Sequence, residues 1–226
     1  MREGAKVALH GRDTQALSAV LADIAQAGGQ ASYVTGDTTK FSDIEAMRRR
    51  IEREFGPVDI LVANAGGSFT TPGPIEQTSE EEWRASIDGN LTATFLTIKS
   101  FLPRMKEGGT GTIITISSAA ARRPYAMAPI AYAAAKAGIE ILTQDLAGQV
   151  GPYGIRANCI APETILTERN KTRIPSTQQD DLIELHPIKR LGTPEDVAHA
   201  ALYLASDDAA WIAGVVLDVA GGAVMV

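Results

Sequence analysis

Residues 58–67 read Val-Asp-Ile-Leu-Val-Ala-Asn-Ala-Gly-Gly, a short apolar run that stops at a polar, glycine-rich turn. A strand that is apolar at nearly every position is covered on both faces, which is typical of a parallel sheet between helices. Five more β-rich runs occur in the chain, and helical segments separate them. The six expected strands are 5–11, 31–36, 58–63, 112–117, 155–160 and 215–219.

The segments between the strands carry the start and stop signals of helices. Asp13 is placed to cap a helix over 14–27, and Ser42 and Glu45 have the spacing of a capping box. The repetition of strand and helix predicts right-handed crossovers and a doubly wound, mostly parallel sheet in a three-layer α/β/α arrangement. The remaining helices are expected over 79–105, over 130–150 and from Thr193 onward.

Composition narrows the class of protein. The 226 residues suffice for one α/β domain, 1–226, and a net charge of -6 without a basic block argues against nucleic acid and anionic membranes as partners. No signal peptide opens the chain, and no apolar run reaches the roughly 20 residues that span a bilayer. Cys159 is the only cysteine and the histidines are dispersed. We therefore expect no disulfide, no metal site and a cytoplasmic protein.

Tyr132 and Lys136, with three alanines between them, predict a site for proton transfer. Residues four apart on a helix share a face, so the Lys136 ammonium can lie beside the Tyr132 phenol. A nearby cation favours the ionised phenol and lowers its pKa toward the neutral range. The Ser118 hydroxyl, one strand-to-helix connection upstream, is placed to hold a reacting oxygen. Ligands of such sheets bind beyond the carboxyl ends of the strands, where these side chains are expected.

Several motifs, in the right order, resemble the short-chain dehydrogenase/reductase family over nearly the whole chain. Tyr132 with Lys136 is similar to its Tyr-x-x-x-Lys motif, and Ser118 is similar to its catalytic serine. The stretch 191–198 resembles the 3-oxoacyl-carrier-protein reductases of the family. The other matching positions are the Asn64-Ala65-Gly66 turn, the helix residue Asn90, and Gly221-Gly222 near the end.

The resemblance implies a Rossmann-like fold and hydride transfer between a nicotinamide and a ketone, a 3-oxoacyl group or a secondary alcohol. In this interpretation Tyr132 gives or takes the proton and Ser118 hydrogen-bonds the substrate oxygen. Lys136 holds the cofactor ribose and lowers the tyrosine pKa, and Asn90 anchors a water that links Lys136 to solvent. The family also implies a homo-oligomer, a dimer or tetramer.

The cofactor predicted from the sequence is NADP(H) rather than NAD(H). Arg12 follows Gly11 at the end of the first expected strand, where a guanidinium can bind a 2'-phosphate and a carboxylate would instead bind the ribose hydroxyls. Asp37 can equally serve as a turn acceptor. The resemblance assigns Asp37 and Thr38 to the adenine edge, and it assigns further cofactor contacts to Asn64, Ala65, Gly66, Tyr132, Lys136, Pro162 and Thr167.

The sequence departs from the family at two places. The first strand, the Gly-rich loop and the first helix are absent, about 25 to 30 residues judged against a βαβ unit. The sequence begins late, the protein is truncated, or another chain fills the gap; the intact catalytic set favours the first alternative. Glu163 stands after Pro162, where the family usually has glycine, at the start of a stretch over 163–190 that we expect to form a mobile lid.

Three further interpretations stay open. A lyase of the halohydrin dehalogenase type shares the fold, the serine and the tyrosine and uses no nucleotide, although those enzymes have arginine where Lys136 stands. A non-catalytic assembly or binding subunit fits the missing Gly-rich loop. Arg122 and Arg123 could steer an anionic or carrier-bound acyl substrate, although a solvated surface pair is the plainer interpretation.

Overall fold

The computed structural model describes residues 4–124 and 128–225, apart from the side chain of Arg169. All six expected strands form, and every pair of neighbouring strands runs parallel. Each strand bound lies within two residues of the expected one. The strands are β1 (Val7–Gly11), β2 (Ala31–Thr35), β3 (Ile60–Ala63), β4 (Gly111–Ile116), β5 (Ile155–Pro162) and β6 (Val216–Val219).

The strands form two separate sheets among the described residues. Strands β3, β4, β5 and β6 pair in that order, with Ile60 opposite Thr112 and Cys159 opposite Val216. Strand β1 pairs only with β2, so the edges of β1 and β3 are not hydrogen-bonded to each other. Ile60 and Val62 of β3 are consequently exposed, at 43% and 46%.

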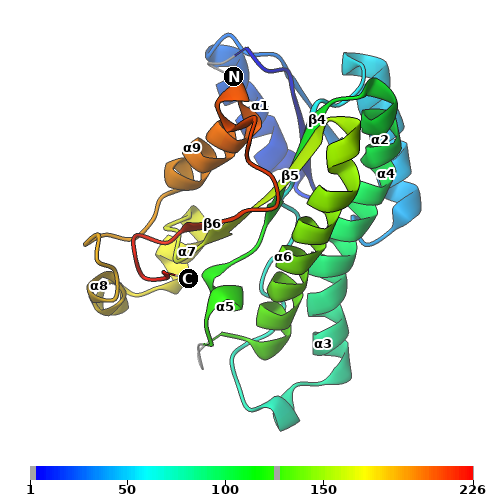
Figure 1. Ribbon diagram of the computed structural model, residues 1–226. Coiled ribbons are helices and arrows are strands. Elements are labelled where there is room, and N and C mark those ends of the chain that lie inside the picture. Colours follow the sequence, from blue (N-terminus) through cyan, green and yellow to red (C-terminus); the bar gives the residue numbers. More distant parts are fainter. Residues whose placement is uncertain (1–3, 125–127, 226) are drawn as a thin grey trace.

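Helices cover both faces of the four-stranded sheet (Figure 1). Ile113 of β4 packs into a core with α2, α4 and α6, whereas its neighbour Ile114 packs against α9 on the opposite face. Successive strand residues therefore serve different layers, which makes the α/β/α arrangement. The helices are α1 (Thr14–Gln26), α2 (Phe41–Phe55), α3 (Glu80–Ile87), α4 (Ala93–Gly108), α5 (Ala119–Arg122), α6 (Ile130–Val150), α7 (Glu168–Arg173), α8 (Ser176–Glu184) and α9 (Pro194–Ala205).

Three of the expected helix starts are confirmed. The Asp13 carboxylate accepts hydrogen bonds from the first turn of α1. Ser79 and Glu82 form a reciprocal capping box at α3, and Thr193 and Asp196 form another at α9. These caps satisfy backbone donors that the helix itself leaves free, so local sequence determines where the three helices begin.

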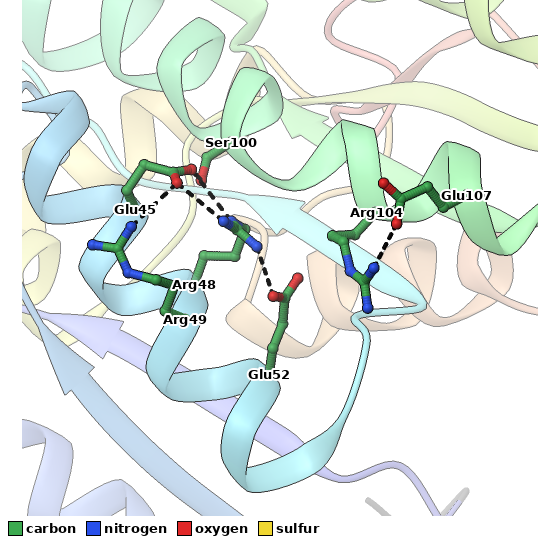
Figure 2. A network of polar contacts seen from close by, with 7 residues as sticks. All are labelled: Glu45, Arg48, Arg49, Glu52, Ser100, Arg104 and Glu107. Carbon is green, nitrogen blue, oxygen red and sulfur yellow. Dashed lines mark hydrogen bonds and ion pairs between the residues drawn. The ribbon is translucent and has the colours of Figure 1, made fainter.

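The predicted capping box at Ser42 and Glu45 is wrong. Helix α2 begins at Phe41, and the Glu45 carboxylate binds Arg48 of its own helix and the Ser100 hydroxyl of α4 (Figure 2). Hydrogen bonding from Arg48, and then from Ser100, lowers the pKa of Glu45 to about 2. A contact between helices therefore replaces the local cap.

The single helix expected over 79–105 is also wrong, because a π-helical segment over Asp88–Thr92 separates α3 from α4. Asn90 lies in this segment and is fully buried. Its side-chain Nδ2 donates to the Ser86 carbonyl at 2.8 Å, within the helix, and to the Gly67 carbonyl outside it. Such π segments are frequent at functional sites, and this one reaches the turn after β3.

Residues 163–190, expected as a lid, contain two short helices. Thr167 caps α7 by accepting a hydrogen bond from the Asn170 backbone, and Pro175 precedes α8. Figure 1 shows α7 and α8 beside β6 and across from α5. The segment therefore lies next to the carboxyl ends of β4, β5 and β6.

Candidate active site

The Ser118 hydroxyl lies where β4 turns into α5. Strand β4 ends at Ile116, and Ser118 caps α5 by accepting a hydrogen bond from the Ala120 backbone at 3.2 Å. The Ser118 hydroxyl also lies close enough to the Tyr132 phenol to lower its pKa. Ser118 and Tyr132, fourteen residues apart in the sequence, thus lie together in the structure, as the sequence predicted.

Tyr132 lies in the first turn of α6, at the mouth of a cavity of about 430 Å³. The cavity is of the size that holds small ligands, and Ser118 and Tyr132 both line it. Burial raises the pKa of Tyr132, and the Glu163 carboxylate raises it further, while the hydrogen bond from Ser118 lowers it. The expectation that Lys136 lowers this pKa is therefore not met, because burial outweighs the other effects.

Lys136 lies one turn further along α6 and is 5% exposed. Its Nζ donates to the Ile116 carbonyl at 2.8 Å and lies 5.6 Å from the centre of the Tyr132 ring. Burial lowers the pKa of Lys136 to about 8. The ammonium is thus held by the end of β4, beside the tyrosine ring, as the shared helix face predicted.

Asn90 clamps the turn that follows β3. Its Oδ1 accepts from the Gly67 amide and its Nδ2 donates to the Gly67 carbonyl, both at 3.0 Å. Gly66 has φ +153°, and a Cβ there would lie 2.5 Å from the Asn90 Oδ1. The side-chain amide is therefore committed to the backbone of this turn, and glycine is required where the two approach.

Arg122 is not a solvated partner of Arg123. Its guanidinium binds Asp218 of β6 at 3.0 Å and Glu140 of α6 at 3.2 Å, and all three side chains are less than 20% exposed. Glu140 in turn accepts from the buried Ser117 hydroxyl at 2.7 Å. This network ties the end of β4 to α6 and β6, whereas Arg123 is exposed and lines the cavity.

The sequence interpretation missed several side chains of the cavity. Ser68 follows the turn after β3, Asn170 and Arg173 come from α7, and Leu182 comes from α8. Leu185, at the end of α8, was expected from the sequence as part of an apolar wall and does line the cavity. The sequence predicted a lid over 163–190, but it did not predict the helices α7 and α8, which determine the side chains that face the cavity. Glu163 and Thr164 complete the wall beside Tyr132.

The two residues expected near an adenosine lie at the ends of β1 and β2. Arg12 is exposed, and its charge contributes to a lowered Asp37 pKa, whose largest cause is the hydrogen bond from the Thr39 hydroxyl. Asp37 also accepts from the Thr39 backbone at 2.9 Å, so it acts as the turn acceptor that the sequence left open. Thr38 lies within the same turn.

The residues at the strand ends fit a dinucleotide. The Asn64–Gly67 turn follows β3, and Pro162 and Thr167 lie at and after the end of β5, so the two groups lie on the same edge of the sheet on either side of β4. The backbone of the turn is fixed by Asn90, and the Arg12 guanidinium has no acidic partner among the described residues. Backbone groups and a free cation are the donors that a pyrophosphate and a ribose phosphate require.

Residues 4–124 and 128–225 include neither a membrane-spanning helix nor a metal-ligand cluster. The described helices include none with the length and apolar character needed to cross a bilayer. Within the same residues, His, Cys, Asp and Glu side chains do not gather in groups of three that could hold a metal ion.

Comparison with known proteins places the chain in a family. A family profile described as enoyl-(acyl carrier protein) reductase matches residues 1–224. The 7alpha-hydroxysteroid dehydrogenase of Escherichia coli is 35% identical over 98% of this chain and 85% of its own length. The 3-oxoacyl-(acyl-carrier-protein) reductase of Chlamydia muridarum is 34% identical over 97% of this chain and 87% of its own.

Solved structures of dehydrogenases have the same fold as this chain. A 7 alpha-hydroxysteroid dehydrogenase complexed with NADH and 7-oxo glycochenodeoxycholic acid superposes with a TM-score of 0.92 at 35% identity, covering 98% of this chain and 85% of the other. A gluconate 5-dehydrogenase from Burkholderia cenocepacia in complex with NADP and tartrate gives 0.89 at 27% identity, covering 98% and 86%. With its parallel sheet, its ordered motifs and these relatives, the chain belongs to the short-chain dehydrogenase/reductase family of oxidoreductases.

Proposed function

We propose that the protein interconverts a ketone or 3-oxoacyl compound and the corresponding secondary alcohol, with NADP(H) as the hydride partner and Tyr132 as the general acid/base. The observation that carries the proposal is that Ser118 and Tyr132 line one cavity, with Lys136 buried beside the tyrosine ring. Family membership supports the nicotinamide cofactor.

Tyr132, protonated at neutral pH, is suited to give its proton to a carbonyl oxygen during reduction and to recover it from the alcohol during oxidation. Ser118 donates a hydrogen bond to the same oxygen and thereby orients it. Lys136 and the Asn64–Gly67 turn would hold the cofactor, which supplies or accepts the hydride. The remaining task of the chain is to exclude water, for which α7 and α8 lie beside the cavity.

NADP(H) is preferred in this proposal because Arg12 is exposed at the end of β1 and Asp37 is occupied by Thr39. An occupied carboxylate is less available to ribose hydroxyls, and a free guanidinium favours a 2'-phosphate. Since one similar structure holds NADP and another holds NADH, the preference depends on these two residues.

We also propose a cytoplasmic homo-oligomer. Large apolar side chains are exposed on α3, α4 and α6, namely Trp83, Phe95 and Ile141, and burial of such a surface between subunits stabilises a dimer. The single cysteine, Cys159, is buried and free, as expected in a reducing compartment.

The test is turnover of a ketone panel, followed by the loss of NADPH or NADH absorbance. The proposal expects turnover that is faster at limiting NADPH than at limiting NADH, and a drop of about tenfold in that preference in Arg12→Ala. Arg50→Ala, an exposed arginine of α2, is the matched control and leaves the preference unchanged. Equal use of both cofactors by the wild type contradicts the assignment of Arg12.

The two rival functions give different results in the same assay. A lyase of the halohydrin dehalogenase type releases halide from a vicinal halohydrin without nucleotide. A binding subunit turns over neither kind of substrate. Either outcome overturns the proposed oxidoreduction of ketones.

A further inference from the structure

The cavity at Tyr132 carries two cations on walls that come from different parts of the chain. Arg123 directly follows α5, the helix that Ser118 caps, and Arg173 is the last residue of α7, the helix that Thr167 caps. Both arginines line the cavity that Tyr132 and Ser118 line. Fifty residues separate them in sequence, so the fold alone brings them to one ligand site.

Neither arginine has an acidic partner among the residues that the structure describes. Arg48, Arg84 and Arg122 each bind a carboxylate, and Glu168, the acidic residue at the start of α7, is bound by Lys171. Arg123 and Arg173 are exposed, so water can solvate their charges while no ligand is present. Both guanidinium forks are consequently available to an incoming anion.

The position of Arg123 is fixed by its neighbour. Arg122 is held by Asp218 and Glu140 in a poorly exposed network, and this network anchors the C-terminal end of α5. Arg123 extends from that anchored residue to the cavity. A guanidinium on an anchored backbone loses less freedom on binding than one on an unsupported loop, which strengthens its use in recognition.

The charge of the lining limits the ligand further. Among the described residues that line the cavity, two guanidinium groups and the carboxylate of Glu163 leave one net positive charge, in a chain whose net charge is -6. The cavity therefore attracts an anion that the rest of the surface repels. A single carboxylate neutralises one net positive charge, whereas a phosphate dianion would leave a partly buried net negative charge that is costly to desolvate. Leu182, Leu185 and Pro129 provide apolar contact for the rest of such a molecule.

We propose that the substrate is an oxo acid or hydroxy acid whose carboxylate is bound by Arg123 and Arg173, in addition to the oxygen on which Tyr132 acts. The proposal rests on the proposed function for the reaction and adds the substrate class. Arg123 and Arg173 determine specificity, and they take no part in the proton transfer.

The experiment compares acids with their neutral esters: levulinate with methyl levulinate, and an oxo-octanoate with its methyl ester. The wild type is expected to favour each acid in kcat/KM by about tenfold or more, the worth of a charge-assisted hydrogen bond. Arg123→Gln and Arg173→Gln each reduce that preference about five- to tenfold through KM, and leave the esters unchanged. Arg53→Gln, an exposed arginine of α2 outside the cavity, is the matched control.

Two results overturn the proposal: equal use of acid and ester by the wild type, or an equal loss for acid and ester in the arginine variants. Inorganic phosphate and acetate serve as competing anions, and stronger inhibition by phosphate overturns the choice of a carboxylate. If no ketone is turned over, the proposed function fails, and calorimetric titration with oxo-octanoate then decides the anion site by itself. Weaker binding in the double variant Arg123→Gln/Arg173→Gln than in the wild type supports the site. Equal binding in the double variant and the wild type, or no binding in the wild type, contradicts it.

Discussion

Strand β4 of the four-stranded sheet and strand β1 of the two-stranded sheet differ in how deeply their residues are buried. In β4 every residue but the last is buried, and Ile113 and Ile114 are fully so, whereas no residue of β1 is buried. The side chains proposed for the chemistry lie at the end of β4 and on α6. Those proposed to read the adenosine, Arg12 and Asp37, lie on exposed turns after β1 and β2.

Residues near the proton-transfer site are held rigidly, whereas the residue proposed to recognise the cofactor phosphate is not. Ser117, Lys136 and Asn90 are at least 95% buried, and each is held by several hydrogen bonds or by one to a strand end. Arg12 has no such support. A proton-transfer group requires placement within fractions of an ångström, while a phosphate contact tolerates a flexible cation.

Substitution of the two adjacent serines separates chemistry from structure. Ser118→Ala removes the hydroxyl beside Tyr132, so kcat is expected to fall by about 10²- to 10³-fold, and loss of the α5 cap is expected to cost no more than about 1 kcal/mol of stability. Ser117→Ala removes the buried hydroxyl that donates to Glu140 and the Lys136 carbonyl, although Arg122 still binds Glu140, and is expected to cost about 1 to 2 kcal/mol of stability, with kcat reduced less than about tenfold. Steady-state kinetics and urea unfolding measure both. The reverse pattern would assign the catalytic role to Ser117.

Truncation of one residue in each sheet tests their unequal packing. Ile113→Ala in β4 is expected to lower the free energy of unfolding by about 3 to 4 kcal/mol, since the side chain is fully buried and leaves a cavity. Leu9→Ala in β1 is expected to cost about 1 kcal/mol because Leu9 is only partly buried. Urea denaturation of both variants provides the comparison, and equal costs would show that the two sheets are equally well packed.

Removal of the Glu163 charge is expected to have the smallest effect. Glu163 raises the pKa of Tyr132, so Glu163→Gln lowers that pKa. Because the protonated phenol is the acid, the alkaline limb of the reductive pH profile of kcat/KM moves to lower pH. Glu54→Gln, an exposed residue of α2, controls for net charge. A shift to higher pH, or the same shift in both variants, contradicts the assignment.

Local signals in the sequence predicted the strands, most helix starts and the Ser118, Tyr132 and Lys136 set. Asp13 and Ser79 cap their helices through residues two or three positions away, so the pattern is contained in a short window. The misassigned features depend on distant partners. The Glu45 carboxylate accepts a hydrogen bond from Ser100, 55 residues away, and Arg122 donates to Asp218, 96 residues away.

The candidate site shows the same limit. The spacing of Tyr132 and Lys136 follows from helix geometry, whereas the sign of the Tyr132 pKa shift depends on burial by the completed fold. Arg123 and Arg173 meet at one cavity only because α5 and α7 end beside it. Arg122 is bound by Asp218 and Glu140 and Arg123 is not, a difference that the sequence next to these two residues does not predict.

The central claim is that Tyr132 transfers the proton, and kcat of Tyr132→Phe tests it most directly. Tyr153→Phe, at an exposed tyrosine stacked on Lys106 and outside the cavity, is the matched control. We expect Tyr132→Phe to fold as the wild type does, to bind NADPH, and to lose about 10³-fold in kcat, while Tyr153→Phe stays within about twofold. A Tyr132→Phe enzyme that keeps more than about a tenth of the wild-type kcat would contradict the account.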